Sequence, residues 1–215
     1  MKIKAVFFDL DGTIIRNTDS VRYLCIQNDR LSEFEKIECL EDDNNIPWIE
    51  ADYLKAELIK GLSFRDADDK FDDNIELIQN LEMVLTYLKE KGVKSVLITA
   101  GPIQVANILG TKFDFDGIYG SQYELKDQKF TGKILSHLGS KGKVNGLNDF
   151  CANNSICLNQ CVAIGDSESD IDIFKKCSKS IAINYSDALK GKASDYIITD
   201  DLSDIIDIIE SWLAE

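Results

Sequence analysis

Residues 3–13 read IKAVFFDLDGT, a short and largely apolar run that ends abruptly at two aspartates and a glycine. Such a run is typical of a β-strand buried on both faces. In extended backbone, residues two apart point the same way, so Asp9 and Asp11 face one site while Leu10 faces the other side. Gly12 allows a sharp turn and leaves backbone N–H groups free to approach an anion. The stretch therefore predicts a buried strand with a polar end.

Strands and helices alternate along most of the remaining chain. Residues 94–99 and 161–164 read as further apolar strands, each followed by a helical pattern, and a helix is expected from about Lys143. Strands that alternate with helices imply right-handed crossover connections. We expect an α/β, Rossmann-like fold with a mainly parallel sheet and helices on both faces, formed by residues 1–13 and 74–215.

Residues 14–73 depart from this alternation. Their sequence is charged and favours helix, and the apolar positions are interrupted. We expect a small helical cap subdomain inserted after the first strand.

Two further strands end in residues suited to chemistry. The strand at 94–99 ends at Thr99 and is followed by Ala100 and Gly101, so a hydroxyl precedes small residues whose N–H groups can cradle phosphate oxygens. The strand at 161–164 is followed by Asp166, with Asp170 about one helical turn further on. A single aspartate at a strand end is most often a turn former or a helix N-cap. Three polar strand ends at one edge of a sheet, where ligands of such folds bind, instead indicate a site.

The composition limits the partners. A formal net charge of −14 and a pI near 4.5 argue against a nucleic-acid partner, which requires a basic face. A phosphate site in so acidic a chain needs local positive charge, so a metal ion and at least one lysine are expected. No apolar run is long enough to span a membrane, and no signal pattern precedes the first strand, so a cytoplasmic protein without a membrane partner is expected.

Cysteine and histidine offer weaker candidates. Six scattered cysteines fit reduced thiols better than a disulfide framework. Cys151, Cys157 and Cys161 lack the fourth ligand and the tight pair of a structural zinc site. His137, the single histidine, is expected to be structural or on the surface.

The motifs together resemble those of the haloacid dehalogenase superfamily. Residues 9–13 (DLDGT), Thr99, a lysine in residues 140–143 (SKGK), and Asp166 with Asp170 match its four motifs in order and spacing, most closely those of the phosphoserine phosphatase branch. The resemblance implies the fold of that superfamily, with a small helical cap closing over the site.

The resemblance also implies roles for the acidic residues. Asp9 would be the nucleophile that forms an aspartyl-phosphate, and Asp11 the general acid and then base. Mg²⁺ would be held by the carboxylates of Asp9 and Asp166 and the backbone carbonyl of Asp11, with Asp170 in the outer shell.

Phosphate oxygens would be held by a second group of residues. Thr99, Ala100, Gly101 and Lys141 are expected to form it. Lys141 is preferred to Lys143 because a Lys-Gly pair occurs at this place in the phosphoserine phosphatase pattern.

The cap departs from the phosphoserine phosphatase pattern. Thr18 stands where an acidic residue is expected, with Asp19 beside it, and Arg65 is a loose match for the arginine that binds a substrate carboxylate. Ser169 replaces an asparagine common in that branch.

The expected function is therefore a Mg²⁺-dependent phosphatase of a small phosphorylated metabolite, with phosphoserine the first compound to test. The alternatives are a phosphosugar mutase of the same superfamily, a phosphatase of another metabolite, and a silent module that only binds a phosphorylated partner. The sequence carries no signal for an oligomeric state.

Overall fold

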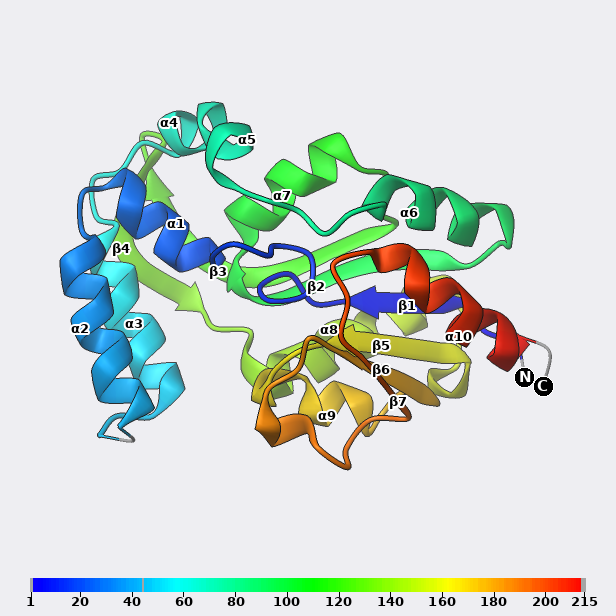
Figure 1. The fold of residues 1–215 in the computed structure, drawn as a ribbon. Helices are drawn as coiled ribbons and strands as arrows, with labels where there is room; N and C mark the ends of the chain where they lie inside the picture. The colour runs from blue at the N-terminus through cyan, green and yellow to red at the C-terminus, as the bar shows by residue number, and fades with distance from the viewer. Residues whose placement is uncertain (1, 44, 214–215) are drawn as a thin grey trace.

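The computed structural model describes residues 2–43 and 45–213 as a sheet with helices on both faces and further helices beyond one of its ends (Figure 1). The described residues form a seven-stranded sheet in the order β4-β3-β2-β1-β5-β6-β7. Its strands are β1 (Ala5–Phe8), β2 (Lys94–Pro102), β3 (Gly117–Lys126), β4 (Lys129–Ser136), β5 (Cys161–Gly165), β6 (Lys179–Ile183) and β7 (Asp195–Ile197). Neighbouring strands are parallel except β3 and β4.

The register of the central strands brings their ends to one level. Phe8, the last residue of β1, pairs with Leu97 of β2 on one side and Ile164 of β5 on the other. The backbone N–H of Asp9 then donates to the carbonyl of Ile164 at 2.9 Å. The polar residues that follow these strands therefore meet at one edge of the sheet.

Helices cover both faces because side chains of a strand alternate between them. Val6 and Phe8 belong to one buried cluster and Ala5 and Phe7 to another. The first cluster includes residues of α6 (Leu81–Glu90), α7 (Ile103–Lys112) and α10 (Ile205–Leu213), and the second residues of α8 (Gly139–Asn154) and α9 (Ile171–Phe174). The expected α/β fold with a mainly parallel sheet is confirmed.

The segment 14–73, here called the cap, is helical as expected. Its helices are α1 (Ser20–Gln27), α2 (Leu31–Asp42), α3 (Trp48–Leu58), α4 (Phe64–Asp69) and α5 (Phe71–Asn74). Asp19 caps α1 by accepting from the N–H of Arg22, and Ser63 caps α4 by accepting from the N–H of Asp66. In Figure 1, α1 to α3 stand beyond the ends of the strands and α4 and α5 lie above them.

The hairpin of β3 and β4 joins the cap to the sheet. Its turn, at Asp127 and Gln128, has φ angles of 51° and 61°, which suit a tight hairpin. Beyond the turn, the N–H of Phe130 donates to the carbonyl of Leu62 at 2.9 Å, and the N–H of Gly61 donates to the carbonyl of Phe130 at 2.8 Å. The hairpin is thus paired to the chain between α3 and α4.

Two helix starts differ from expectation. The spacing of Ile78, Leu81, Leu85 and Leu88 predicts a helix with these residues on one face. The structure begins α6 only at Leu81, and the N–H of Ile78 donates to the carbonyl of Ile14 instead. The helix expected from about Lys143 begins at Gly139.

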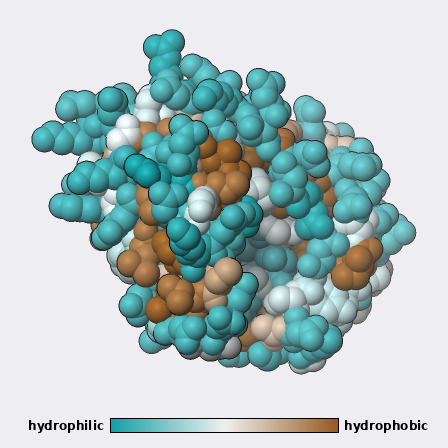
Figure 2. All heavy atoms as spheres, turned by 60° about the vertical axis from the view of Figure 1, so that its left-hand side comes forward, coloured by the Kyte–Doolittle hydropathy of each residue, from teal (hydrophilic) through white to brown (hydrophobic). Residues whose placement is uncertain are grey.

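No helix among residues 2–43 and 45–213 is long and apolar enough to cross a membrane. Figure 2, a view turned toward the cap side, shows a mostly hydrophilic surface with scattered hydrophobic side chains.

Candidate active site

A cavity of about 730 Å³ lies where the ends of the central strands meet the cap. Its core side is formed by the residues that follow β1 and β5, by the end of β2 and by one side chain of α8. Its cap side is formed by residues of the segment after β1 and of α1, α2 and α3. Those from the core are Asp9, Asp11, Gly12, Thr99, Ala100, Gly101, Lys143, Asp166, Ser167, Glu168 and Ser169, and those from the cap are Arg16, Asn17, Thr18, Asp19, Val21, Arg22, Glu41, Trp48, Asp52 and Lys55.

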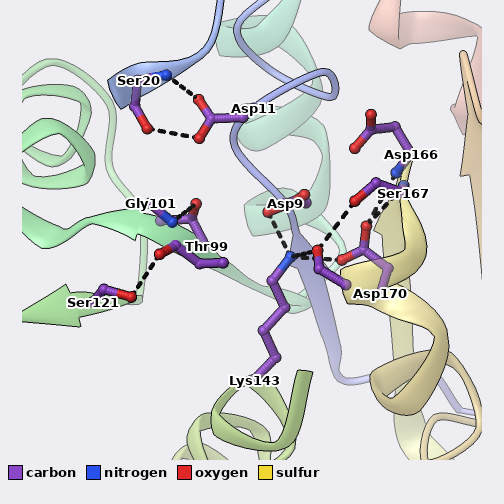
Figure 3. Close-up of polar contacts among 12 residues, drawn as sticks. Asp9, Asp11, Ser20, Thr99, Gly101, Ser121, Lys143, Asp166, Ser167 and Asp170 are labelled. Atoms are coloured by element: carbon purple, nitrogen blue, oxygen red, sulfur yellow. Dashed lines mark hydrogen bonds and ion pairs between the residues drawn. The ribbon is translucent and has the colours of Figure 1, made fainter. Parts of the chain in front are cut away.

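Lys143 forms the centre of the charged contacts on the core side. Its Nζ lies 2.8 Å from Oδ1 of Asp9 and 2.7 Å from Oδ1 of Asp170, and its side chain is fully buried (Figure 3). Burial alone would lower the pKa of Lys143, but the charges of Asp170 and Asp9 outweigh it and hold that pKa above its ordinary value. The site therefore contains one permanent cation in contact with Asp9.

The choice of Lys141 is corrected by this geometry. Lys141 and Lys143 both lie inside α8, two positions apart, so their side chains point about 200° from each other around the helix. Lys141 is exposed, whereas Lys143 shares the buried face with Leu147 and Phe150. The apolar positions four and seven residues after Lys143 were the available signal, because they mark the face that packs on the sheet.

A cluster of carboxylates beside Lys143 suits a metal ion. Asp9, Asp166 and Asp170 each offer an oxygen within 4.8 Å of the others. Oδ1 of Asp166 is buried without a hydrogen-bond partner among the described residues, while Oδ2 of Asp170 accepts from the N–H groups of Asp166 and Ser167 at 3.2 Å. A Cβ on Gly12 would lie 2.1 Å from Oδ2 of Asp166, so glycine leaves room for that carboxylate. Hard oxygen ligands of this kind fit Mg²⁺.

Asp11 points away from this cluster. Its Oδ1 accepts from the N–H of Ser20 at 2.7 Å, and its Oδ2 accepts from the hydroxyl of Ser20 at 2.6 Å (Figure 3). Its carboxyl is therefore held at the cap side of the cavity by the first residue of α1. No sequence pattern marks Ser20 as a partner of Asp11, because this contact forms only when α1 folds back over the end of β1.

The end of β2 forms the opposite wall. The hydroxyl of Thr99 is buried and accepts from the N–H of Gly101 at 2.9 Å. Ser121 donates to the carbonyl of Ala100 at 2.5 Å and so fixes this stretch from β3. A Cβ on Gly101 would lie 2.4 Å from Oγ of Ser20, which makes a glycine necessary there. All three residues expected at this strand end line the cavity.

The carboxyl groups are protonated more easily than usual in the metal-free protein. Burial, then the charge of Asp170, raises the pKa of Asp9 to about 7. Burial, then the charge of Asp19, raises the pKa of Asp11 to about 8. Burial and the charge of Asp9 raise the pKa of Asp166 well above its ordinary value. Such a concentration of perturbed acids in one cavity is typical of an active site.

Other residues named from the sequence lie elsewhere. Arg65 lies on α4 with 85% of its side chain exposed and does not line the cavity. His137 packs against Trp48, and its Nε2 lies 2.7 Å from Oδ2 of Asp52, so it connects the end of β4 to the cap. Sγ of Cys151 lies 3.4 Å from Sγ of Cys161 inside the core. None of Arg65, His137, Cys151 and Cys161 lines the cavity.

The sequence matches a protein-family model over most of its length. The model described as "haloacid dehalogenase-like hydrolase" matches residues 6–175. The chain belongs to this family. Membership of the haloacid dehalogenase-like hydrolases confirms the family that the motifs predicted, and with it that the chain is an enzyme.

Individual relatives are similar over the full length. A phosphoserine phosphatase of Methanocaldococcus jannaschii is 25% identical over 212 residues, which are 97% of this chain and 99% of that protein. A structure described as a phospho-aspartyl intermediate analogue of phosphoserine phosphatase superposes with a TM-score of 0.84 at 24% identity, covering 97% of this chain and 99% of that one. A family hydrolase from Salmonella enterica serovar Typhi gives 0.89 at 19% identity, covering 98% and 72%. The haloacid dehalogenase-like fold thus extends to the cap.

Proposed function

We propose that this chain is a Mg²⁺-dependent phosphatase that hydrolyses a small phosphate monoester through an aspartyl-phosphate on Asp9. The observation that supports this best is the contact of Asp9 with the buried cation Lys143 beside the unpartnered oxygen of Asp166. One cavity thus contains a nucleophile, the fixed positive charge of Lys143 and a carboxylate oxygen of Asp166 that can bind a metal cation. The similarity to phosphoserine phosphatases supports the same reaction.

The metal is assigned to the acidic cluster. The carboxylates of Asp9 and Asp166 and the backbone carbonyl of Asp11 would hold Mg²⁺, and Asp170 would act from the outer shell because both its oxygens already accept from Lys143, Asp166 and Ser167. When bound, the dication offsets the repulsion between a carboxylate and a phosphate dianion, about 4 kcal/mol per pair of unit charges at 4 Å in a partly screened site.

Asp9 and Asp11 divide the chemistry between them. An oxygen of Asp9 attacks phosphorus and the ester P–O bond breaks, while the carboxyl of Asp11 gives its proton to the leaving oxygen. The carboxylate of Asp11 then takes a proton from water as that water attacks phosphorus, and the bond to Asp9 breaks. Ser20 holds Asp11 in place for both proton transfers.

Thr99 and Lys143 hold the phosphoryl group. Thr99, Ala100, Gly101 and Lys143 all line the cavity that contains Asp9, and the ammonium of Lys143 lies 2.8 Å from Oδ1 of Asp9. They stabilise the negative charge of the equatorial oxygens as it spreads in the transition state. Lys143 takes the role that the motif order gave to Lys141.

The cap, residues 14–73, would close over a core of residues 1–13 and 74–215. It supplies about half of the residues that line the cavity, so it excludes water and contacts the leaving group. A small phosphorylated metabolite is the substrate class that fits a cavity of about 730 Å³.

A quench experiment tests the reaction. The protein is mixed with Mg²⁺ and p-nitrophenyl phosphate, quenched in acid within milliseconds, and digested for mass spectrometry. We expect a phosphate adduct on the peptide that contains Asp9, and free phosphate at longer times. Asp9→Asn should abolish both, whereas the control Asp69→Asn, at a side chain that is 68% exposed, should retain both.

Three results would contradict the proposal. Full turnover by Asp9→Asn would show that Asp9 is not the nucleophile. Full activity in a chelator would show that the reaction does not require a metal ion. Phosphate transferred to a second substrate instead of released would indicate a mutase.

A further inference from the structure

We propose that His137 is a positioning residue for the reaction, which acts through Asp52 to hold helix α3 of the cap over the cavity. This inference rests on the proposed function and deepens it. His137 does not line the cavity, but it contacts two residues that do, Trp48 and Asp52. The pair of His137 and Asp52 is here called the clamp. Three features support it: the surroundings of the imidazole, the anchoring of α3, and a connection to the end of β2.

The first feature is that the imidazole of His137 packs against one side of α3. Its Nε2 lies 2.7 Å from Oδ2 of Asp52, and because a carboxylate oxygen can only accept, Nε2 is the donor. The centroid of the imidazole lies 5.5 Å from the ring centroid of Trp48 and 5.8 Å from that of Tyr53. Only 7% of the side chain of His137 is exposed. The ring is therefore enclosed by residues about one helical turn apart, which share a side of the helix.

The second feature is that the two ends of α3 are anchored differently. After its C-terminal end, the N–H of Gly61 donates to the carbonyl of Phe130 at 2.8 Å and so ties the chain to β4. At its N-terminal end the cap position is occupied by Pro47, which makes no side-chain capping hydrogen bond. A helix end without such a bond is less stable than a capped one. The contact of Asp52 with His137 instead attaches the N-terminal half of α3 to the core.

The third feature is that the backbone beside His137 is linked to the end of β2. The N–H of Leu138 donates to the hydroxyl of Ser121 at 2.8 Å, and that hydroxyl donates to the carbonyl of Ala100 at 2.5 Å. Ala100 belongs to the stretch that would hold the phosphoryl group. Hydrogen bonds thus connect this stretch to the chain next to His137, and the imidazole connects the same part of the chain to Asp52 of the cap.

The clamp should affect the leaving group more than the phosphoryl group. Trp48 and Asp52 line the cap side of the cavity, whereas Asp9 and the residues that would hold phosphate line its core side. A protein whose cap is closed for only part of the time binds a cap-contacting substrate more weakly by that fraction. A saturating substrate holds the cap closed through its own contacts. Loss of the clamp should therefore raise KM and leave kcat nearly unchanged.

Two substitutions separate the hydrogen bond of the clamp from the packing of its ring. His137→Phe keeps a planar ring beside Trp48 and Tyr53 but removes the donor, whereas His137→Gln keeps an N–H donor without a ring. With Mg²⁺ and p-nitrophenyl phosphate, we expect His137→Phe to raise KM about fivefold or more and to change kcat less than about twofold. His137→Gln should keep KM within about twofold of the wild-type value. The Ki of inorganic phosphate, which has no leaving group, should change less than about twofold in both variants.

A matched control and a double substitution locate the effect. Asp72→Asn removes a different ion pair between the cap and the core, that of Asp72 in α5 with Lys112 in α7. This pair lies outside the cavity, so KM should stay within about twofold of the wild-type value. Asp52→Leu removes the acceptor of the clamp. In that background His137→Phe should raise KM less than about twofold, because its partner is already absent.

Hydrogen exchange and NMR measure the clamp without turnover. In protein with Mg²⁺ and inorganic phosphate, His137→Phe should speed amide exchange in residues 48–58 about fivefold or more, whereas Asp72→Asn should not. The sequence contains a single histidine, so the imidazole NMR signal of the untagged protein reports on His137 alone. That signal should shift in Asp52→Leu and stay in place in Asp72→Asn.

The outcomes separate the clamp from the proposed function. Unchanged KM and unchanged exchange in His137→Phe would overturn the clamp, and the phosphatase would remain. An equal rise of KM and of the Ki of phosphate would overturn it too, because His137 would then only stabilise the fold. A full effect of His137→Phe in the Asp52→Leu background would overturn the role of Asp52. A wild-type protein that hydrolyses no ester would overturn the phosphatase, and the exchange of residues 48–58 would then decide the clamp alone.

Discussion

The ammonium nitrogen of Lys143 lies 2.8 Å from Oδ1 of Asp9, and the same nitrogen lies 2.7 Å from Oδ1 of Asp170. Both carboxylates are thereby fixed by one buried cation. In the proposed reaction, Lys143 would position Asp9 for attack and would lower the repulsion between its carboxylate and an incoming phosphate.

Lys143→Met should lower kcat/KM about 100-fold or more, because it removes a charge that acts on the transferred phosphoryl group. It should also lower the melting temperature, since it leaves buried carboxylates without their partner. Lys141→Met is the matched control in the same helix and should change kcat/KM less than about twofold, because Lys141 is exposed. Steady-state kinetics and thermal unfolding measure both. Equal effects of the two substitutions would show that Lys143 does not contact the phosphoryl group.

Gly12→Ala should weaken Mg²⁺ binding about tenfold or more, because it displaces the carboxylate of Asp166, a proposed metal ligand. The new Cβ would lie 2.1 Å from Oδ2 of Asp166. The control is Gly61→Ala, because Gly61 also has a positive φ, 90° against 74° for Gly12, but has nothing within 4 Å of its Cβ position. Both substitutions cost backbone strain of about 1–2 kcal/mol, yet only the first should alter metal titration by calorimetry. Unaltered affinity in Gly12→Ala would remove Asp166 from the metal site.

The stability of the metal-free protein should fall as the pH rises. The pKa of Asp9 is raised from 3.8 to about 7, and that of Asp11 from 3.8 to about 8. Between pH 3.8 and these raised values, the folded chain therefore binds more protons than the unfolded chain. Their contribution to stability is fully present below pH 3.8 and is lost as the pH rises through 7 to 8. The melting temperature in a chelator should therefore decrease from pH 5.5 to 8.5, and Mg²⁺ should raise it more at the higher pH. A chelated protein that gains stability over this interval would contradict the assignment.

Asp11→Asn should affect alkyl phosphates more than p-nitrophenyl phosphate. A phenolate of low basicity leaves without a proton donor, whereas an alkoxide does not. With the aryl ester the variant should accumulate the adduct on Asp9, because water lacks its base in the second step. Rapid-quench mass spectrometry measures the adduct. Equal losses on both esters without any adduct would restrict Asp11 to a structural or metal-binding role.

The sequence predicts the parts of the site that depend on strand ends. Asp9 and Asp166 follow apolar strands, and parallel strands place such residues at one edge, so local pattern and one topological rule are sufficient. Lys141 was the wrong choice for a different reason. The motif locates the lysine only to within one helical turn, and the side of α8 that packs on the sheet decides between Lys141 and Lys143.

The contacts of the cap could not be predicted in this way. Lys55 meets Glu41, and Ser20 meets Asp11, only through the packing of α1, α2 and α3 over the sheet. A helical pattern of apolar residues indicates which side of a helix is buried, but it does not say against what. Residues 126–128 favour a hairpin turn in the sequence. The pairing of β4 with Leu62 depends instead on where the cap lies.

The central position of β1 affects how the chain folds during its synthesis on the ribosome. Ala5 pairs with Lys94 on one side and with Cys161 on the other, so the first strand to be translated waits for residues made much later before either edge is paired. Contacts so distant along the chain form slowly, and the unpaired strand is exposed to aggregation meanwhile. Because Asp9 follows β1 and Asp166 follows β5, a nascent chain cannot assemble the metal cluster before β5 has docked. The acidic cluster thus forms only after β5 has joined the sheet.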